Sequence, residues 1–339
     1  MRKLPDIDLE SSSIYEILSG RIKARVLLTG IELGVFDHLS APRSGPEIAQ
    51  ELETHPGSTE AMLDSLACLG LIEKNNGLYR NTTEAEISLC QKSPAYVGEM
   101  VGMIYRMSSG ALQDMTTLVK SGPPPGSPDM GDQAIWADYA RSMANYQLGG
   151  PARKLAGLIS KIQGFSSFER MLDLGGGSGM LCIAVLAQHP TMRGVVFDQP
   201  SVVKMTESFI AEYEMQDRMS VMGGDYTSDS LGEGYDLVLA SATLNFVGDD
   251  LGPLMRKIHQ TLKPGGVFVS LAEGITHEHT RPPGMILENL THALYGQVKM
   301  FEKGEIARAM DQAGFSPIES RTVPTPFCPI EMDVGRKSG

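Results

Sequence analysis

The sequence has few cysteines. Its four, Cys68, Cys90, Cys182 and Cys328, are far apart and form no Cys-x-x-Cys pair. Disulfide frameworks and structural zinc sites both depend on several cysteines at suitable spacings. We therefore expect four free thiols, a reducing compartment and no metal site.

Long apolar runs and an excess of positive charge are also absent. No stretch reaches the ~20 apolar residues that a transmembrane helix needs, and the N-terminal MRKLPDIDLESSS has no apolar signal core. Lys and Arg number 29 against 41 Asp and Glu, which gives a net charge of −12. Nucleic acid and anionic membranes would be repelled by such a chain. We expect a cytoplasmic protein that binds neither.

The chain is long enough for two domains. It has 339 residues, of which 42% are hydrophobic, and this suits a globular protein with more than one core. The patterns described below predict a mostly helical first domain, a set of connecting helices that contribute to an acceptor pocket, and a catalytic domain. Their expected bounds are 1–110, 111–165 and 166–339.

The first domain has the pattern of a winged helix. Apolar residues recur at helical spacing over residues 14–39 and again over 58–69. Asn76-Gly77 then separates two short apolar runs, which predicts a β-hairpin.

A winged helix suggests DNA binding, but the charges disagree. The helix over 58–69, which would enter the groove, carries Glu60 and Asp64 and neither Lys nor Arg, so phosphates would repel it. Residues 14–39 are more apolar than a lone surface helix should be. The sequence therefore predicts a dimerisation module and a homodimer.

From residue 170 the pattern changes to strands alternating with helices. The short apolar runs are RMLDL, RGVVFD, MSVMGGD, YDLVLAS and GGVFVSLAE, and the intervening helical stretches cover 180–188, 201–215 and 249–262. This alternation predicts an α/β fold, with a doubly wound, Rossmann-like parallel sheet and helices on both faces. The carboxyl ends of the strands then meet at one edge, where ligands bind.

A glycine-rich turn follows the first of these strands. Asp173 closes the strand, and GGGSG occupies 175–179 before an apolar helix. Glycine lets the backbone come close to a ligand at a helix N-terminus. No Lys-Ser/Thr pair follows the glycines, so this is not a phosphate loop.

Acidic residues also close the next two strands. Asp198 ends the second strand, where a carboxylate accepts hydrogen bonds from ribose hydroxyls in nucleotide-binding sheets. Asp225 and Tyr226 follow the third strand and offer an acceptor and a flat ring for adenine. Three aspartates at three successive strand ends predict a nucleotide-type cofactor.

The motifs LDLGGGSG, VVFDQP, GGDYT and LKPGG resemble those of class I S-adenosyl-L-methionine-dependent methyltransferases. With its winged-helix front end, the chain is similar to small-molecule O-methyltransferases of the caffeate and acetylserotonin type. The resemblance covers nearly the whole chain from about residue 14.

The resemblance implies a homodimer with S-adenosylmethionine as methyl donor. It places the cofactor over Gly175 and Gly177, its ribose on Asp198 and its adenine near Asp225 and Tyr226. The full set of expected cofactor residues is Asp173, Gly175, Gly177, Asp198, Gln199, Asp225, Tyr226 and Ser241.

A small-molecule acceptor would lie against the predicted helix over 133–147, with Tyr146 and Asn245 at the reacting atoms. The expected acceptor residues are Tyr105, Arg106, Trp136, Tyr139, Arg141, Met143, Tyr146 and Asn245.

One departure from the family bears on the reaction. These O-methyltransferases carry a His-Asp-Trp signature after the fourth strand, and its histidine removes the proton from the acceptor hydroxyl. Here the matching residues are Asn245, Phe246 and Val247. An asparagine amide cannot take up a proton at physiological pH. A thioether sulfur has no proton to lose, so the change favours S-methylation.

The layout and the missing histidine also resemble those of bacterial S-methyltransferases that act on 4-methylthio-2-hydroxybutyrate in dimethylsulfoniopropionate synthesis. Two alternatives stay open. One is an O-methyltransferase whose base has moved to another histidine, for which the candidates are His259, His277, His279 and His292. The other is a non-catalytic protein that binds a nucleotide.

Overall fold

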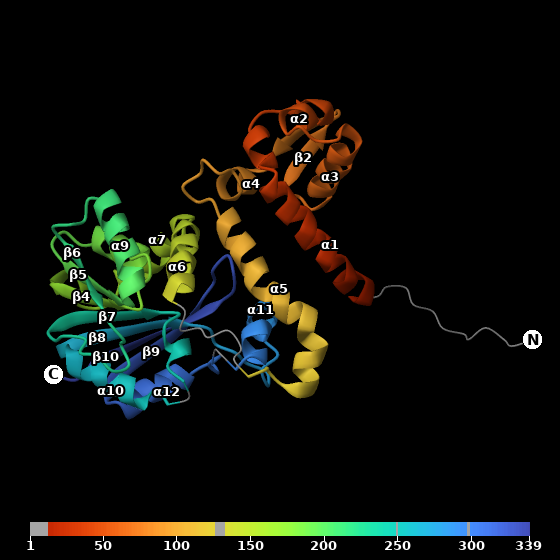
Figure 1. The fold of residues 1–339 in the computed structure, drawn as a ribbon. Helices are drawn as coiled ribbons and strands as arrows, with labels where there is room; N and C mark the ends of the chain where they lie inside the picture. The colour runs from red at the N-terminus through yellow and green to blue at the C-terminus, as the bar shows by residue number, and fades with distance from the viewer. Residues whose placement is uncertain (1–12, 126–132, 249, 297–298) are drawn as a thin grey trace, which may run out of the picture. The chain divides into compact units, whose positions relative to one another are not determined.

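The computed structural model describes residues 13–125, 133–248, 250–296 and 299–339. The chain divides into two compact units, Met1–Gly102 and Met103–Gly339, and Figure 1 shows the elements of each. The sequence placed its domain boundaries near residues 110 and 165, which both fall within the second unit. The segment SGPPPGSPDMG at 121–131 breaks regular structure and predicts an exposed loop, part of which lies outside the described residues. All four cysteines are free thiols, as predicted.

The first unit is a small winged-helix-like fold. Its three-stranded antiparallel sheet has the order β1-β3-β2. Asn76 and Gly77 join β2 to β3 with φ angles of 51° and 80°, the positive values that a tight hairpin turn requires, so the predicted hairpin is confirmed. The elements are α1 (Ser13–Glu32), η1 (Val35–His38), β1 (Arg43–Ser44), α2 (Gly45–Glu51), α3 (Pro56–Cys68), β2 (Ile72–Asn75), β3 (Leu78–Asn81) and α4 (Thr83–Ser88).

An acidic residue of α3 stabilises this unit. Asp64 accepts a hydrogen bond from Lys74 Nζ at 2.5 Å and another from Tyr79 Oη at 2.6 Å, so it ties α3 to the hairpin. Tyr79 itself is fully buried among Phe36, Leu63 and their neighbours. Asp64, whose charge argues against DNA binding, therefore has a structural role: it holds α3 to the hairpin.

The second unit is built on a seven-stranded sheet of order β6-β5-β4-β7-β8-β10-β9. The strands from β6 to β8 are parallel, and β10 runs antiparallel to both β8 and β9. The predicted doubly wound sheet is confirmed. Its strands are β4 (Arg170–Leu174), β5 (Arg193–Asp198), β6 (Met219–Gly223), β7 (Tyr235–Ser241), β8 (Leu262–Ala272), β9 (Phe315–Val323) and β10 (Ile330–Lys337).

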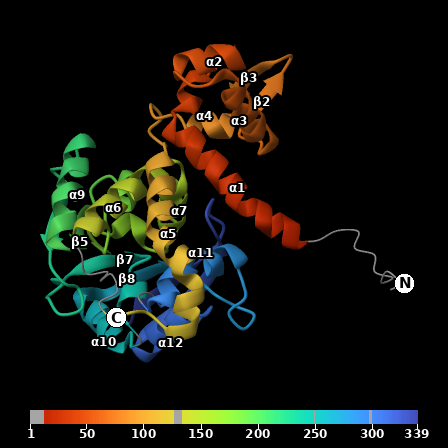
Figure 2. The same ribbon diagram turned by 45° about the vertical axis from the view of Figure 1, so that its right-hand side comes forward.

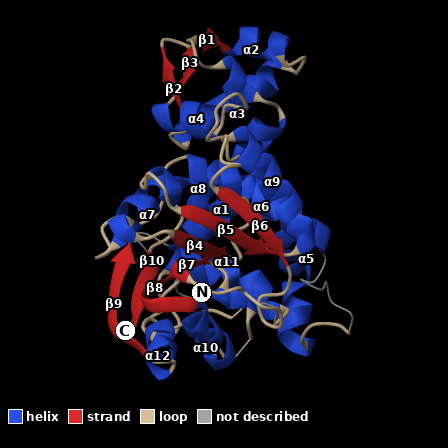
Figure 3. Ribbon diagram, turned by 90° about the vertical axis from the view of Figure 1, so that its left-hand side faces the viewer, coloured by secondary structure: helices blue, strands red, loops and turns tan. Residues whose placement is uncertain are grey.

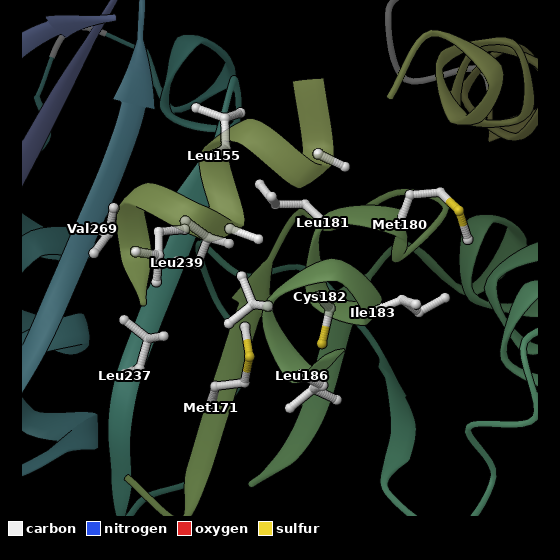
Figure 4. Close-up of a cluster of buried hydrophobic side chains, with 14 of the residues drawn as sticks. Leu155, Met171, Met180, Leu181, Cys182, Ile183, Leu186, Leu237, Leu239 and Val269 are labelled. Carbon is white, nitrogen blue, oxygen red and sulfur yellow. The ribbon is translucent and has the colours of Figure 1, made fainter. Parts of the chain in front are cut away.

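Helices cover both faces of this sheet (Figures 2 and 3). On one face Met171, Leu237 and Val269 pack with Cys182 and residues of α7 and α8, as Figure 4 shows. On the other, Leu172, Val238 and Phe268 pack against α10 and α12. Alternate residues of one strand point to opposite faces, and both faces are buried, so the strands are apolar throughout. The helices are α5 (Gly98–Ser121), α6 (Gln133–Leu148), α7 (Pro151–Ile159), η2 (Phe165–Ser167), α8 (Met180–Ala187), α9 (Pro200–Glu212), η3 (Leu244–Phe246), α10 (Gly252–Thr261), α11 (Pro283–Leu294) and α12 (Glu305–Gln312).

The last two strands were not predicted. β9 and β10 pair in one register from Val323 with Ile330 to Ile318 with Gly335, and the register then shifts before Phe315 pairs with Lys337. Since β10 is antiparallel to β8, with Glu331 opposite Ala272, the connection 324–329 lies at the same edge as the carboxyl ends of β4 to β8. We call this edge, including that connection, the carboxyl edge.

Helix α1 presents an apolar surface to solvent. Among its residues, Ile17 is 75% exposed and Leu18 59%, and the other large exposed side chains are those of Ile14, Tyr15 and Ile22. Such a stripe on a helix is typical of an interface with another chain. In the described residues, no helix has the length and apolarity that crossing a membrane requires.

We predict that the double substitution Ile17→Glu with Leu18→Glu dissociates a homodimer, because it places two charges in a buried apolar interface. Sedimentation or light scattering should show a shift toward monomer or soluble aggregate. Lys23→Glu, a charge change on an exposed position of the same helix, is the control and should leave the mass unchanged. A double variant that keeps the dimer mass would contradict the assignment of this surface.

Candidate active site

The glycine-rich turn after β4 lies where the order of the strands reverses, between β4 and β7. Gly175, Gly177 and Gly179 have φ angles of 65°, 55° and 76°, in the left-handed region that favours glycine. A Cβ at Gly175 would lie 2.5 Å from Cγ2 of Thr243, which follows β7. Thr243 Oγ1 in turn donates to the Leu174 carbonyl at 2.8 Å. The turn geometry therefore favours glycine at all three positions, and the close approach to Thr243 requires it at Gly175.

Asp198 binds the same turn from the end of β5. Its two carboxylate oxygens accept the backbone N–H groups of Gly177, at 2.8 Å, and Gln199, at 2.7 Å. Burial raises the pKa of Asp198, and these two hydrogen bonds offset part of the rise. A half-buried carboxylate at this sheet edge fits the pair of ribose hydroxyls for which the sequence predicted it.

Asp173 is buried at the end of β4, 1% exposed. No hydrogen bond of ordinary geometry reaches either of its oxygens in the described part of the chain, and the same holds for Gln199 Oε1. Burial, and secondarily the charge of Asp198, raise the pKa of Asp173 to about 7, although the backbone N–H of Cys182 offsets part of the rise. Buried acceptors without donors are rare in folded proteins and are a mark of ligand sites.

Unpartnered acceptors at this edge fit S-adenosylmethionine. The cofactor carries an ammonium group and ribose hydroxyls, all of them donors, and a positive sulfonium. Asp173 and Gln199 offer acceptors that have no hydrogen-bond partner in the described residues, and Asp198 offers a further carboxyl group beside a turn that admits a close ligand. The residues present therefore fit this cofactor.

The remaining expected cofactor residues lie at the ends of β6 and β7. Asp225 is exposed, and its Oδ1 accepts Thr227 N–H at 2.8 Å, so it closes a turn of its own. Tyr226 is half-buried, and its hydroxyl donates to the Thr243 carbonyl at 3.2 Å. Ser241 ends β7 and accepts a hydrogen bond from Thr243 Oγ1 at 3.2 Å. All three are at the carboxyl edge, and their contacts with adenine or ribose stay predictions.

Helix α6 covers this edge with aromatic side chains. The Trp136 ring lies 4.8 Å from that of Phe246 and 5.9 Å from that of Tyr139, centre to centre, in edge-to-face geometry. One residue further along α6, Ala140 lies 3.5 Å from where a Cβ of Gly177 would be. We call Trp136, Tyr139 and Phe246 the aromatic wall; it connects the glycine turn to the segment that holds Asn245.

The other expected acceptor residues divide into two groups. Tyr146 lies at the carboxyl edge, where its hydroxyl donates to Thr325 Oγ1 at 3.3 Å and its ring lies 6.4 Å from that of Phe327. Met143 is half-buried on α6. Tyr105, Arg106 and Arg141 are exposed, and no hydrogen bond, ion pair or ring contact joins them to these residues in the described part of the chain.

Asn245 occupies the position of the family base and is 6% exposed. Its Nδ2 donates to a carboxylate oxygen of Glu273, and to the Lys299 carbonyl at 2.9 Å. Both partners can only accept, so they fix the amide with its nitrogen toward them. Oδ1 is left without a hydrogen-bond partner among the described residues. Glu273 and Lys299 could not be found from the sequence, because they lie 28 and 54 positions away.

The candidate histidines do not gather at this edge. His259 packs on Phe315 at 4.9 Å, at the opposite, amino end of β8, and burial lowers its pKa. His277 and His279 are exposed in a turn, and His279 pairs with Glu302 at 2.9 Å. His292 is half-buried on α11.

A cavity of about 420 Å³ opens at the amino edge of the sheet, away from all these residues. Its lysine, Lys263, is already paired with Glu169 and Asp236, and Arg218 is bound to backbone carbonyls. In the described residues, no three His, Cys, Asp or Glu side chains gather as metal ligands.

Two family descriptions match this chain. Residues 143–316 match the O-methyltransferase domain, and residues 15–90 match the O-methyltransferase dimerisation domain. The chain belongs to the O-methyltransferase family. The methyltransferase is thus an S-adenosylmethionine-dependent enzyme, as the sequence predicted, and its dimerisation domain supports a homodimer.

The relatives include proteins named as O-methyltransferases and one named as an N,N-dimethyltransferase. This methyltransferase is 30% identical to the 3-hydroxy-5-methyl-1-naphthoate 3-O-methyltransferase of Streptomyces sahachiroi, over 68% of each chain. It is 27% identical to the N,N-dimethyltransferase OxyT of Streptomyces rimosus, over 90% of this chain and 91% of the relative. Its fold matches human N-acetylserotonin methyltransferase in complex with S-adenosylmethionine, with a TM-score of 0.80 at 22% identity, over 98% of this chain and all of the other.

We predict that Asp198→Ala weakens binding of S-adenosylhomocysteine about 100-fold or more. Two hydrogen bonds to a carboxylate are worth roughly 1.5–3 kcal/mol each, and 1.4 kcal/mol is about tenfold in affinity. Calorimetric titration measures the change, and circular dichroism checks the fold. Asp217→Ala, at an exposed position of the amino edge, is the matched control. Unchanged affinity in Asp198→Ala would remove this carboxylate from the site.

Asp173→Asn should stabilise the cofactor-free enzyme above pH 7 and weaken its cofactor binding. The pKa of Asp173 is raised from 3.8 to about 7 in the folded state, so the folded protein holds the proton more tightly than the unfolded chain. Stability is then lost as pH rises from about 4 to about 7 and stays low above that range. Thermal unfolding from pH 4 to 8 should show a smaller decline in the variant; equal declines would contradict this.

Proposed function

We propose that this methyltransferase transfers a methyl group from S-adenosylmethionine to the sulfur of a small thioether, with 4-methylthio-2-hydroxybutyrate as the candidate acceptor. The observation that carries the proposal is the state of Asn245. Its amide is bound by Glu273 and the Lys299 carbonyl, and it cannot take a proton. The position that supplies the base in this family therefore supplies none here.

The chemistry of the acceptor explains why this matters. A phenol has a pKa of about 10, and general-base assistance is typically worth ~10²–10⁴ in rate. A thioether sulfur carries a lone pair and no proton, so a base adds nothing to its attack. The protein then needs only to hold the two sulfurs and the methyl group in line.

The aromatic wall supports the same proposal. Methylation of a thioether gives a sulfonium cation, and the faces of Trp and Tyr rings attract cations. Trp136 packs on Tyr139 and on Phe246, the neighbour of Asn245, and Ala140 of the same helix adjoins the glycine turn, which supports a place for these rings beside the transferred methyl group. Arg106 or Arg141, both exposed, would have to meet the acceptor's carboxylate.

A hydroxyl acceptor is the second candidate, and the relatives favour it, since the 30% identical enzyme is named as a 3-O-methyltransferase. It requires a base elsewhere. His259 packs on Phe315 at the amino edge, and His277 and His279 are exposed, so their positions argue against these three as the base. His292, on α11, is the remaining candidate. The alternative of a non-catalytic nucleotide-binding protein is disfavoured by the match to the O-methyltransferase domain.

We also propose that the active enzyme is a homodimer formed through the first unit, and that it is cytoplasmic. The match of residues 15–90 to the dimerisation domain and the apolar surface of α1 support the dimer. The four free thiols support a reducing compartment.

Incubation with labelled S-adenosylmethionine and a panel of thioethers, thiols and phenols tests the proposal. Thioethers should become methylated, and Ala variants of His259, His277, His279 and His292 should keep kcat within a few-fold. Methylation of phenols with silence toward thioethers, and a loss of about 10²-fold or more in one histidine variant, would establish the second candidate instead.

Asn245→His should give no gain in kcat with a thioether, because no proton has to be removed. It should lower activity, since the Glu273 carboxylate would favour the protonated form of an imidazole at this position, which would place positive charge beside the developing sulfonium. Steady-state kinetics from pH 6 to 9 measures this. An increase of tenfold or more in kcat would show that the native acceptor loses a proton.

A further inference from the structure

Glu288 is a carboxyl group on α11 that the functions above do not use. It is half-buried, and in the described residues it makes no hydrogen bond or ion pair. Burial raises its pKa to about 7. A carboxylate that is partly buried and not paired with a cation destabilises the folded protein. The presence of Glu288 at this position therefore needs an explanation.

The surroundings of α11 place Glu288 at the carboxyl edge. Met285 precedes it by one helical turn, on the same side of α11, and packs with Cys328 of the 324–329 connection. Tyr146 of α6 contacts the same connection through Thr325 and Phe327. Helices α6 and α11 therefore both adjoin the 324–329 connection. Glu288 lies on the side of α11 that contacts this connection.

The electrostatics agree with this position. The charge of Glu288 adds to burial in raising the pKa values of Tyr139, Tyr146 and Cys328, so its carboxyl group lies within electrostatic range of all three. The first two come from α6 and the third from the 324–329 connection. Tyr139 also belongs to the aromatic wall, 5.9 Å from Trp136 between ring centres.

We infer that Glu288 is the counter-charge for the positive charge that forms on the acceptor, and that it makes the site selective for acceptors whose methylated product is a cation. The inference rests on the proposed function. In the reaction, the acceptor sulfur's lone pair forms the new S–C bond, and the electron pair of the breaking S–C bond stays on the donor sulfur. No proton moves, and the positive charge passes from donor to acceptor.

The groups around Glu288 are suited to this role. Tyr139, Tyr146 and Cys328 all have raised pKa values and are neutral at pH 7, and His292 lies one turn further along α11. The other carboxyl group that acts on Cys328 is that of Glu273, and it already accepts hydrogen bonds from Asn245 Nδ2 and the Phe301 backbone N–H. The ionised carboxylate of Glu288 attracts the sulfonium cation that remains after methyl transfer to a thioether. It does not stabilise the neutral ether that a hydroxyl acceptor gives, so it distinguishes sulfur acceptors from hydroxyl acceptors.

The first test is binding, which needs no turnover. With S-adenosylhomocysteine present, calorimetry compares the thioether 4-methylthio-2-hydroxybutyrate with its methylated sulfonium. The native enzyme should bind the sulfonium more tightly, and Glu288→Gln should lose roughly 10- to 100-fold of that preference, as expected for removing one charge near a cation. Glu288→Asp should keep part of it. Glu319→Gln, an exposed glutamate on β9, is the control and should bind as the native enzyme does.

The second test is turnover. Glu288→Gln should lower kcat with the thioether roughly 10- to 100-fold and leave the KM for S-adenosylmethionine unchanged. The native pH profile should rise once, with the ionisation of Glu288, and become flat in the variant. If thioethers are methylated and Glu288→Gln matches the native enzyme in kcat and sulfonium binding, the inference is wrong while the proposed function stands.

If thioethers are not methylated at all, the proposed function fails. Should phenols be methylated instead, with a loss of about 100-fold or more in Glu288→Gln, Glu288 would be a general base and the counter-charge role would be excluded. Glu288→Gln removes a burial penalty, so thermal unfolding above pH 7 should show it at least as stable as the native enzyme.

Discussion

The close approach of the β4 turn to the segment after β7 is the constraint on which the site depends. A side chain at Gly175 would collide with Thr243 at 2.5 Å, and Thr243 is itself bound to the end of β4. This contact holds the glycine turn open toward Asp198 on one side and fixes the start of η3, which carries Asn245, on the other. Donor and acceptor sides of the site are therefore positioned by one piece of backbone packing at the reversal of the strand order.

The sequence was most informative where local chemistry dictates structure. The Asn76-Gly77 hairpin, the strand ends at Asp173 and Asp198 and the helices of the sheet follow from turn residues and hydrophobic periodicity, which act over a few positions. The edge strands β9 and β10 were missed. Exposed polar residues interrupt β9, and Pro317 lies within it, so its pattern lacks the apolar run that marks the central strands.

Predicting the acceptor side from the sequence was harder, because its contacts are between distant residues. Asn245 was identified by its place in a motif, but its partners Glu273 and Lys299, and the position of Glu288 opposite α6, depend on the tertiary fold. Sequence reasoning looked for histidine as the replacement base and for arginine as the partner of an anionic acceptor. The described structure instead places an unpaired carboxyl group near the aromatic residues, a type of residue that this reasoning did not consider.

The paired burial of Asp173 and Asp198 has a consequence for the lifetime of the enzyme in the cell. Both pKa values are raised by burial in the protein without ligand, so the empty site stores unfavourable charge at neutral pH. A cationic cofactor relieves that cost, and a ligand that binds only the folded state stabilises it in proportion to its concentration. We expect proteases to degrade the empty enzyme faster than the loaded one. Enzyme abundance would then follow the supply of methyl donor without any separate regulator.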